Sequence, residues 1–106
     1  MRLGRRRPFA DLVDRQLVLF TGEHGGLLAA CGRALDEYRA SGRDDAEERY
    51  GAYVDAVDEA RDALEEMRDT YAGVLDGETA NAYRDAFDAA VRRRFPELAG
   101  ELEEGM

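Results

Sequence analysis

The stretch YGAYVDAVDEARDALEEMRDTY, residues 50–71, decides the fold of this chain. Its apolar side chains recur in alternating steps of three and four, which keeps them on one face of an α-helix, as in a coiled coil. The full stripe extends a little beyond this stretch, and its members are Ala46, Tyr50, Tyr53, Val57, Ala60, Leu64, Met67, Tyr71 and Val74. A long helix with one continuous apolar face needs a second helix against it. The stretch therefore predicts a helix–helix pair.

A second stripe with the same spacing lies earlier in the chain and supplies the partner helix. Its members are Val13, Leu17, Phe20, His24, Leu27, Cys31, Ala34 and Tyr38. Its weak point is the segment between Gly22 and Gly26, where three glycines each cost a helix about 1 kcal/mol relative to alanine. Because the heptad phase passes through this segment unshifted, we expect a continuous but locally weakened helix. The pattern leaves open whether the helix breaks there.

Local signals place three helices at about 8–40, 44–76 and 79–95. Pro8 suits a first turn, and Ser41-Gly42 ends the first helix. Asp44 with Glu47 has the spacing of a capping box for the second helix. Gly77 provides a left-handed residue at its end, and Pro96 stops the third helix.

The chain is therefore expected to be all-α, an antiparallel three-helix bundle built on a long helical hairpin with a shorter third helix. This bundle covers residues 8–95. Residues 1–7 form a basic flexible arm, and residues 96–106 form an acidic tail in which Leu98 and Leu102 dock weakly.

The third helix is about half as long as the other two, so it covers only one end of the hairpin. We expect it to lie beside Phe9 to Phe20 and Leu64 to Leu75, which leaves apolar residues exposed at the other end. These residues are Leu27, Leu28, Leu35, Tyr38, Tyr50, Tyr53 and Val54. Exposed apolar patches on globular proteins mark interfaces, and tyrosine is enriched there. We expect a homodimer through this patch, with a further protein partner as an alternative occupant.

Composition excludes several classes of function. The chain has fifteen arginines, no lysine and twenty-four acidic residues, so its net charge of −9 argues against nucleic-acid binding. Charges interrupt the apolar run after Arg6-Arg7, which excludes an export signal and a membrane span. The single cysteine, Cys31, lies on an apolar stripe and indicates a reduced, structural thiol in a cytoplasmic protein.

His24 is the only histidine and carries the one metal hypothesis that the sequence supports. In a hairpin closed at Ser41-Gly42, Glu23 and His24 lie opposite about Arg61, near Asp58 and Asp62. A histidine among carboxylates can bind a metal ion. The alternative is a histidine satisfied within a helix interface, and the Glu-x-x-His pair of di-iron bundles is absent from the sequence. A dimer would double the available ligands.

Two families share short features with the chain. The acid-x-x-x-Asp step of Asp58-Glu59-Ala60-Arg61-Asp62, within a three-helix unit, resembles half of a PhoU-like phosphate-signalling regulator. The resemblance implies metal binding on the bundle surface through Asp58 and Asp62, with dimerisation replacing the second repeat. Residues 12–18 resemble the first helix of the chorismate mutases, but the lysine that holds their substrate is missing, so this activity is not assigned.

The function expected from the sequence is a non-enzymatic, intracellular interaction or regulatory module that self-associates and needs no cofactor. The alternative is a metal- or phosphate-linked regulator that resembles half of a PhoU-like protein. No nucleophile elbow, phosphate-cradling glycine loop or Cys/His metal spacing occurs in the sequence.

Overall fold

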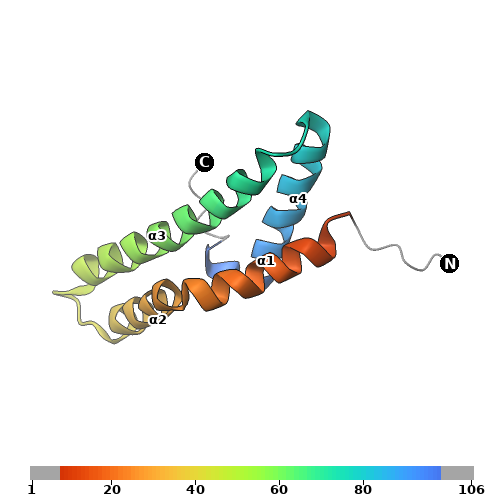
Figure 1. Ribbon diagram of the computed structural model, residues 1–106. Coiled ribbons are helices and arrows are strands. Elements are labelled where there is room, and N and C mark those ends of the chain that lie inside the picture. Colours follow the sequence, from red (N-terminus) through yellow and green to blue (C-terminus); the bar gives the residue numbers. More distant parts are fainter. Residues whose placement is uncertain (1–7, 99–106) are drawn as a thin grey trace.

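The computed structural model describes residues 8–98, which are helical apart from short turns and contain no strand. Its elements are α1 (Ala10–Glu23), α2 (Gly25–Ala40), α3 (Ala46–Ala72) and α4 (Gly77–Arg94), as Figure 1 shows. A further helical turn covers residues 96–98. The all-α prediction is therefore confirmed, although four helices of more than one turn replace the expected three. The arm of residues 1–7 and the tail from residue 99 onward, with Leu102, lie outside the described residues.

The expected first helix is divided at His24, so the expectation of one continuous helix is wrong at this residue. His24 has φ −119° and ψ 30°, outside the helical range. Its N–H still donates to Phe20 O at 2.8 Å, and its carbonyl accepts from Leu28 N–H at 3.1 Å. The division is thus a kink of a single residue, and it falls among the three glycines that weaken the helix. Phe20 and Cys31 remain buried on either side of it, so the apolar stripe continues across the kink.

The turn between α2 and α3 is longer than the sequence predicts. Ser41 caps α2, and its hydroxyl donates to Tyr38 O at 2.6 Å. The prediction of a capping box at Asp44 is wrong. The helix α3 begins at Ala46, and its N-cap is Asp45, which makes no side-chain capping bond. Instead, the N–H of Asp45 donates to Gly42 O at 3.1 Å, which adds a turn of backbone before the helix.

The connection from α3 to α4 also differs from the prediction. Gly77 is the first residue of α4 and not a left-handed end residue, and no described glycine has a positive φ. The N-cap is Asp76, whose Oδ1 accepts from Thr79 N–H at 3.0 Å. This bond holds the pKa of the Asp76 carboxyl below its usual value. A capped start thus allows α4 to begin one or two residues earlier than expected.

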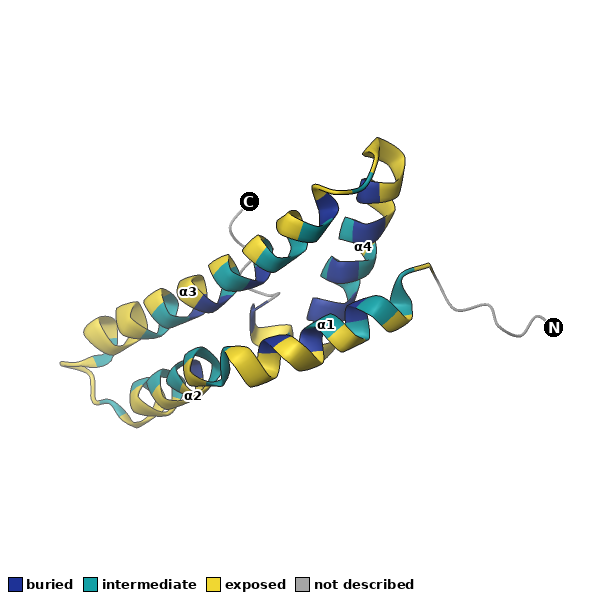
Figure 2. Cartoon of the chain, viewed as in Figure 1, coloured by how far each residue is buried: buried dark blue, intermediate teal, exposed yellow. Residues whose placement is uncertain are grey.

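The buried side chains are gathered at one end of the molecule, where α4 packs against both α1 and α3 (Figure 2). We call this end the base: it comprises α1, α4 and the part of α3 from Val57 onward. Its largest fully buried side chains, each at most 1% exposed, are Val13, Leu17, Phe20, Val57, Tyr83 and Phe87. The other end, residues 32–56, is the hairpin tip, where α2 and α3 pack only against each other and no residue is buried.

Tyr83 is the centre of the base. It is 0% exposed, and its hydroxyl donates to Gln16 Oε1 at 2.7 Å. The ring of Tyr71 lies 4.8 Å from it, and that of Phe9 approaches edge-on at 5.5 Å. Phe9 has a positive φ of 71°, a conformation that costs a non-glycine residue about 1–2 kcal/mol, and the contact with Tyr83 offsets this cost. Burial raises the pKa of the Tyr83 hydroxyl to about 12.

Ion pairs and a short helical turn complete the base. Arg68 of α3 lies 3.0 Å from Asp88 of α4 and 2.9 Å from Asp69. These hydrogen-bonded carboxylates raise the pKa of Arg68, and the guanidinium lowers that of Asp69. Beyond α4, Leu98 is 4% exposed, which confirms that it docks on the bundle.

Candidate functional site: the hairpin tip and the cleft between α1 and α3

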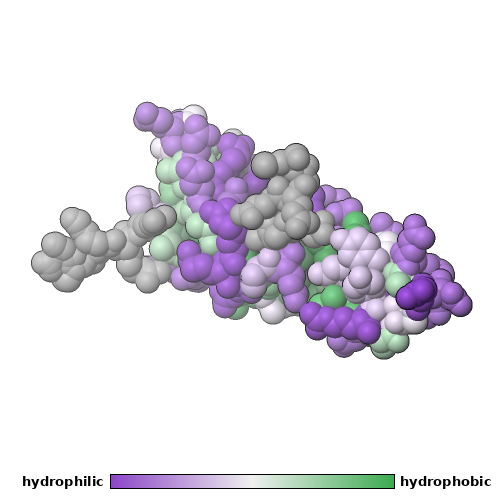
Figure 3. All heavy atoms as spheres, turned by 180° about the vertical axis from the view of Figure 1, so that it is seen from behind, coloured by the Kyte–Doolittle hydropathy of each residue, from purple (hydrophilic) through white to green (hydrophobic). Residues whose placement is uncertain are grey.

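The residues predicted as an interface lie together at and near the hairpin tip. None of them is fully buried: Tyr50 is 44% exposed and the other six are half-buried. The rings of Tyr38 and Tyr50 lie 5.3 Å apart, and those of Tyr50 and Tyr53 lie 6.3 Å apart. We call this set the tip surface: Leu27, Leu28, Leu35, Tyr38, Tyr50, Tyr53 and Val54. Figure 3 shows the molecule from behind, with hydrophobic atoms visible toward the tip and beside the undescribed C-terminal residues.

Cys31 marks the boundary between the tip and the base. Its thiol donates to Ala56 O at 3.3 Å and joins α2 to α3. Burial raises the pKa of this thiol, and the nearby carboxylates of Glu97 and Glu59 raise it further. Because the thiolate is the reactive form, this thiol is suited to packing and not to nucleophilic or redox chemistry.

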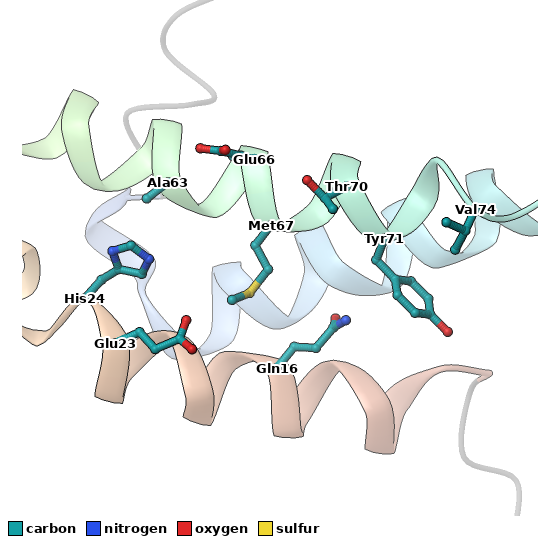
Figure 4. A pocket seen from close by; sticks show the side chains of 9 residues that line it. All are labelled: Gln16, Glu23, His24, Ala63, Glu66, Met67, Thr70, Tyr71 and Val74. Atoms are coloured by element: carbon teal, nitrogen blue, oxygen red, sulfur yellow. The ribbon is translucent and has the colours of Figure 1, made fainter.

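A cleft lies between α1 and α3, and Figure 4 shows the side chains that line it. Its volume is about 580 Å³, within the range of small-molecule pockets. Its walls are supplied by α1 and α3, together with His24 at the kink and Val74 just beyond the end of α3. The lining residues are Gln16, Glu23, His24, Ala63, Glu66, Met67, Thr70, Tyr71 and Val74.

The lining side chains come from the two facing sides of the cleft. Glu23 and His24 lie at the end nearer the kink, and Tyr71 and Val74 lie at the opposite end (Figure 4). The carboxylate of Glu66 lies on the edge of α3 that faces away from Glu23. Met67 and Gln16 lie between the two ends. Glu23 and Glu66 therefore border the cleft from opposite sides and do not meet at one point.

Two contacts hold the walls of the cleft in place. The ring of His24 is stacked on that of Phe20, with centroids 4.8 Å apart and planes tilted by 32°. The side chain of Gln16 is held by the Tyr83 hydroxyl, which connects this wall to the core of the base. These two contacts fix His24 and Gln16 on their side of the cleft.

The structure separates the four residues that the sequence suggested for a metal. Glu23 and His24 line the cleft, but Asp58 and Asp62 do not. Asp58 forms an ion pair with Arg61 at 3.4 Å. Within residues 8–98, no three His, Cys, Asp or Glu side chains are grouped so that they could hold a metal ion. The metal hypothesis stays a prediction that requires ligands from a second copy.

The difference arises from helical register. Cys31 contacts Ala56, and Tyr38 lies beside Tyr50, so the two helices pair about two residues farther along α3 than a hairpin closed at Ser41-Gly42 predicts. The longer turn before Ala46 accounts for this offset. As a result, His24 shares the cleft with Ala63 and Glu66 and not with Asp58 and Asp62.

Sequence reasoning also missed the neighbouring face of α1. Val18 and Leu19 are 57% and 58% exposed, and with Leu12 they border a shallow hollow flanked by Arg15 and Arg94. Both residues lie off the apolar stripe, within the uncharged run from Leu17 to Phe20. That run is the feature of the sequence that could have indicated an exposed apolar face on α1.

Comparison with protein-family models, with curated proteins and with solved structures finds no match for this chain. None of the helices formed by the described residues is long and apolar enough to span a membrane.

Proposed function

We propose that this chain is a non-enzymatic interaction module that works inside the cell and associates with a second copy of itself through the tip surface. The observation that carries the proposal is the contrast in burial between the two ends of one hairpin. The tip surface has the same heptad spacing as the core of the base, yet no third helix among residues 8–98 covers it. Uncovered apolar faces of this kind are typical of protein interfaces.

The charges around the tip support a second copy as the occupant. On α2, Arg33 and Arg39 lie among Asp36 and Glu37. On the facing part of α3, Glu47, Glu48 and Asp55 outnumber Arg49. In a twofold arrangement of two hairpins, α2 of one copy lies against α3 of the other, which brings arginines toward carboxylates. The pair of Arg49 with Glu37, 3.1 Å apart, already joins the two helices within one chain. Complementary charges of this kind set the orientation of two partners more than their affinity.

The packing at the base supports the finer architecture of an antiparallel three-helix bundle, with α1 and α2 acting as one kinked helix. Tyr83 of α4 contacts Phe9 and Tyr71, and Phe95, farther along, has its ring 6.0 Å from that of Phe20. On this basis the Tyr83 part of α4 lies near the start of α1 and Phe95 lies near Phe20, with α4 crossing α1 as Figure 1 shows. Two tips packed together would form a layer of four helices and bury the aromatic residues that α4 does not reach.

The test is the subunit number of the wild type and of Tyr53→Asp, measured by native mass spectrometry. We expect a wild-type dimer and a monomeric variant, because the new carboxylate would be buried without a partner at the dimer interface. Ala52→Asp adds the same charge to an exposed position beside it and should leave the dimer intact. A monomeric wild type, or a Tyr53→Asp variant that remains a dimer with unchanged helix content, would refute the tip surface as the interface.

The same spectrum, recorded on protein purified without chelator, tests the metal- or phosphate-linked alternative. A stoichiometric metal that is lost on replacing Asp58 and Asp62 with asparagine would favour that alternative.

A further inference from the structure

We propose that the shallow hollow on α1 is the docking site of this chain's own acidic segment, residues 99–106. In this arrangement Leu102 covers Val18 and Leu19, and the glutamates of the segment pair with the two arginines that border the hollow. The contact is made within one chain, so the proposal does not depend on self-association through the tip surface.

The hollow presents apolar surface that no residue of the described range covers. Val18 and Leu19 are 57% and 58% exposed, although they lie between Leu17 and Phe20, which are fully buried. Leu12, about two helical turns before Leu19, extends the apolar lining. The hollow has a volume of about 680 Å³, which leaves room for more than one side chain. An occupant with an aliphatic side chain would remove this surface from water.

The charge at the border of the hollow selects an acidic occupant. Arg15 of α1 and Arg94 of α4 line it, against one carboxylate, that of Asp14. Among the described residues, neither of these two arginines forms an ion pair. Arg92 and Arg93 are also exposed in the last turn of α4. Carboxylates of a docked segment would give these guanidinium groups their partners.

The segment that follows Leu98 has the matching chemistry. Its sequence is AGELEEGM, with three glutamates, no basic residue and Leu102 among the glutamates. A leucine flanked by carboxylates complements two aliphatic side chains flanked by arginines. Complementary charges of this kind set the orientation of the segment, and the leucine supplies the apolar contact.

The path of the chain brings this segment to the hollow. Arg94, which lines the hollow, precedes the segment by only five positions. The ring of Phe95 lies 6.0 Å from that of Phe20, the residue after Leu19. The hollow extends about 10 Å along α1 from Leu12, and eight extended residues span up to about 26 Å. Covalent attachment also gives the segment a high effective concentration at this site.

The cleft and the tip surface suit the same segment less well. Glu23 and Glu66 border the cleft, and no described arginine lines it. On the α3 side of the tip lie Glu47, Glu48 and Asp55. Like charges across a contact disfavour binding, so the hollow with its two arginines is the preferred site for three glutamates.

The test is NMR of the full chain with ¹³C-labelled leucine and valine methyl groups. We expect nuclear Overhauser effects between the methyl groups of Leu102 and those of Val18 or Leu19. Leu102→Ser should shift the Val18 and Leu19 resonances and leave those of Leu35, at the hairpin tip, in place. The proposal is overturned if Leu102 shows no Overhauser effect to these residues, or if their resonances are the same in Leu102→Ser.

Charge reversal tests the role of the arginines. Arg15→Glu with Arg94→Glu should lower the ratio of docked to undocked segment about tenfold, because two attractive pairs become repulsive. Adding Glu101→Arg and Glu104→Arg to this variant should restore the Overhauser effects. A contact that survives the first change, or that does not return with the second, would overturn the assignment of the arginines.

Two controls complete the design. Arg33→Glu with Arg39→Glu makes the same change of charge at exposed positions of the hairpin tip and should leave the Leu102 contact intact. A mixture of labelled and unlabelled copies shows whether the contact forms within one chain. Overhauser effects between differently labelled copies would overturn the proposal in favour of a segment donated by a second copy.

Discussion

The base and the hairpin tip of this molecule carry the same heptad spacing but differ in what covers it. At the base, α4 packs on α1 and α3, and side chains such as Tyr83 and Phe87 are at most 1% exposed. At the tip, α2 and α3 have only each other, and Tyr50 remains 44% exposed. An apolar stripe therefore predicts which face of a helix is buried, whereas the number of neighbouring helices decides how completely that face is buried.

Replacing one large side chain at each end gives the largest expected effect. Phe87→Ala should lower the free energy of unfolding by about 3–5 kcal/mol, because it leaves a cavity in the closed core of the base. Leu35→Ala at the half-buried tip should cost less than about 2 kcal/mol, since water can reach the vacated space. Urea unfolding of the wild type and both variants, at a protein concentration that keeps them monomeric, would measure the two losses in free energy of unfolding. Equal losses would show that the two ends are packed alike.

High pH should weaken the base selectively through Tyr83. Burial raises the pKa of its hydroxyl from about 10 to about 12, so the folded state holds this proton more tightly than the unfolded state. The resulting stability is complete below pH 10 and is lost as the pH rises toward 12, by about 2 kcal/mol. Unfolding free energies measured across this range should fall in the wild type. The Tyr83→Phe variant serves as the control and should lack this component of the decline.

Replacing a glycine within the hairpin tip gives the smallest expected effect and tests how far the stability of α3 there can be raised. Gly51 is an exposed residue inside α3, and a Cβ atom added there meets no atom within 4 Å. Gly51→Ala should therefore stabilise the helix by about 1 kcal/mol. Amide hydrogen exchange should slow at the hairpin tip. At Gly73 an added Cβ lies 3.3 Å from Asp69 O, so Gly73→Ala should give a smaller gain; a larger one would contradict this account.

Much of the fold could be predicted because the apolar spacing is regular over both long stripes. The spacing indicates helices, and Val13, Leu17, Phe20, Val57 and Leu64 of these stripes are all buried. The half-burial of the tip surface could be expected from helix lengths alone. The contacts of Tyr83 and Phe95 lie at the end of the hairpin where the sequence analysis expects the third helix.

The cleft could not be predicted, because it depends on two local backbone details. One is the kink at His24, since a count of glycines indicates a weak helix but not the residue at which it bends. The other is the turn before Ala46, where the Asp45 N–H to Gly42 O bond replaces the expected side-chain cap. Together they move His24 away from Asp58 and Asp62 and toward Glu66. Gln16 and Met67 became candidate binding residues only through this register.

The hydrogen bond between Tyr83 and Gln16 joins residues 67 positions apart, and this separation has a consequence for the order of folding. By contrast, the Cys31–Ala56 and Glu37–Arg49 contacts of the hairpin span 25 and 12 positions. Closing a longer loop costs more chain entropy, so short-range contacts form more readily than long-range ones. We therefore expect α2 and α3 to pair early and α4 to dock last. The last step of folding would then be the one that fixes Gln16 and completes the wall of the cleft.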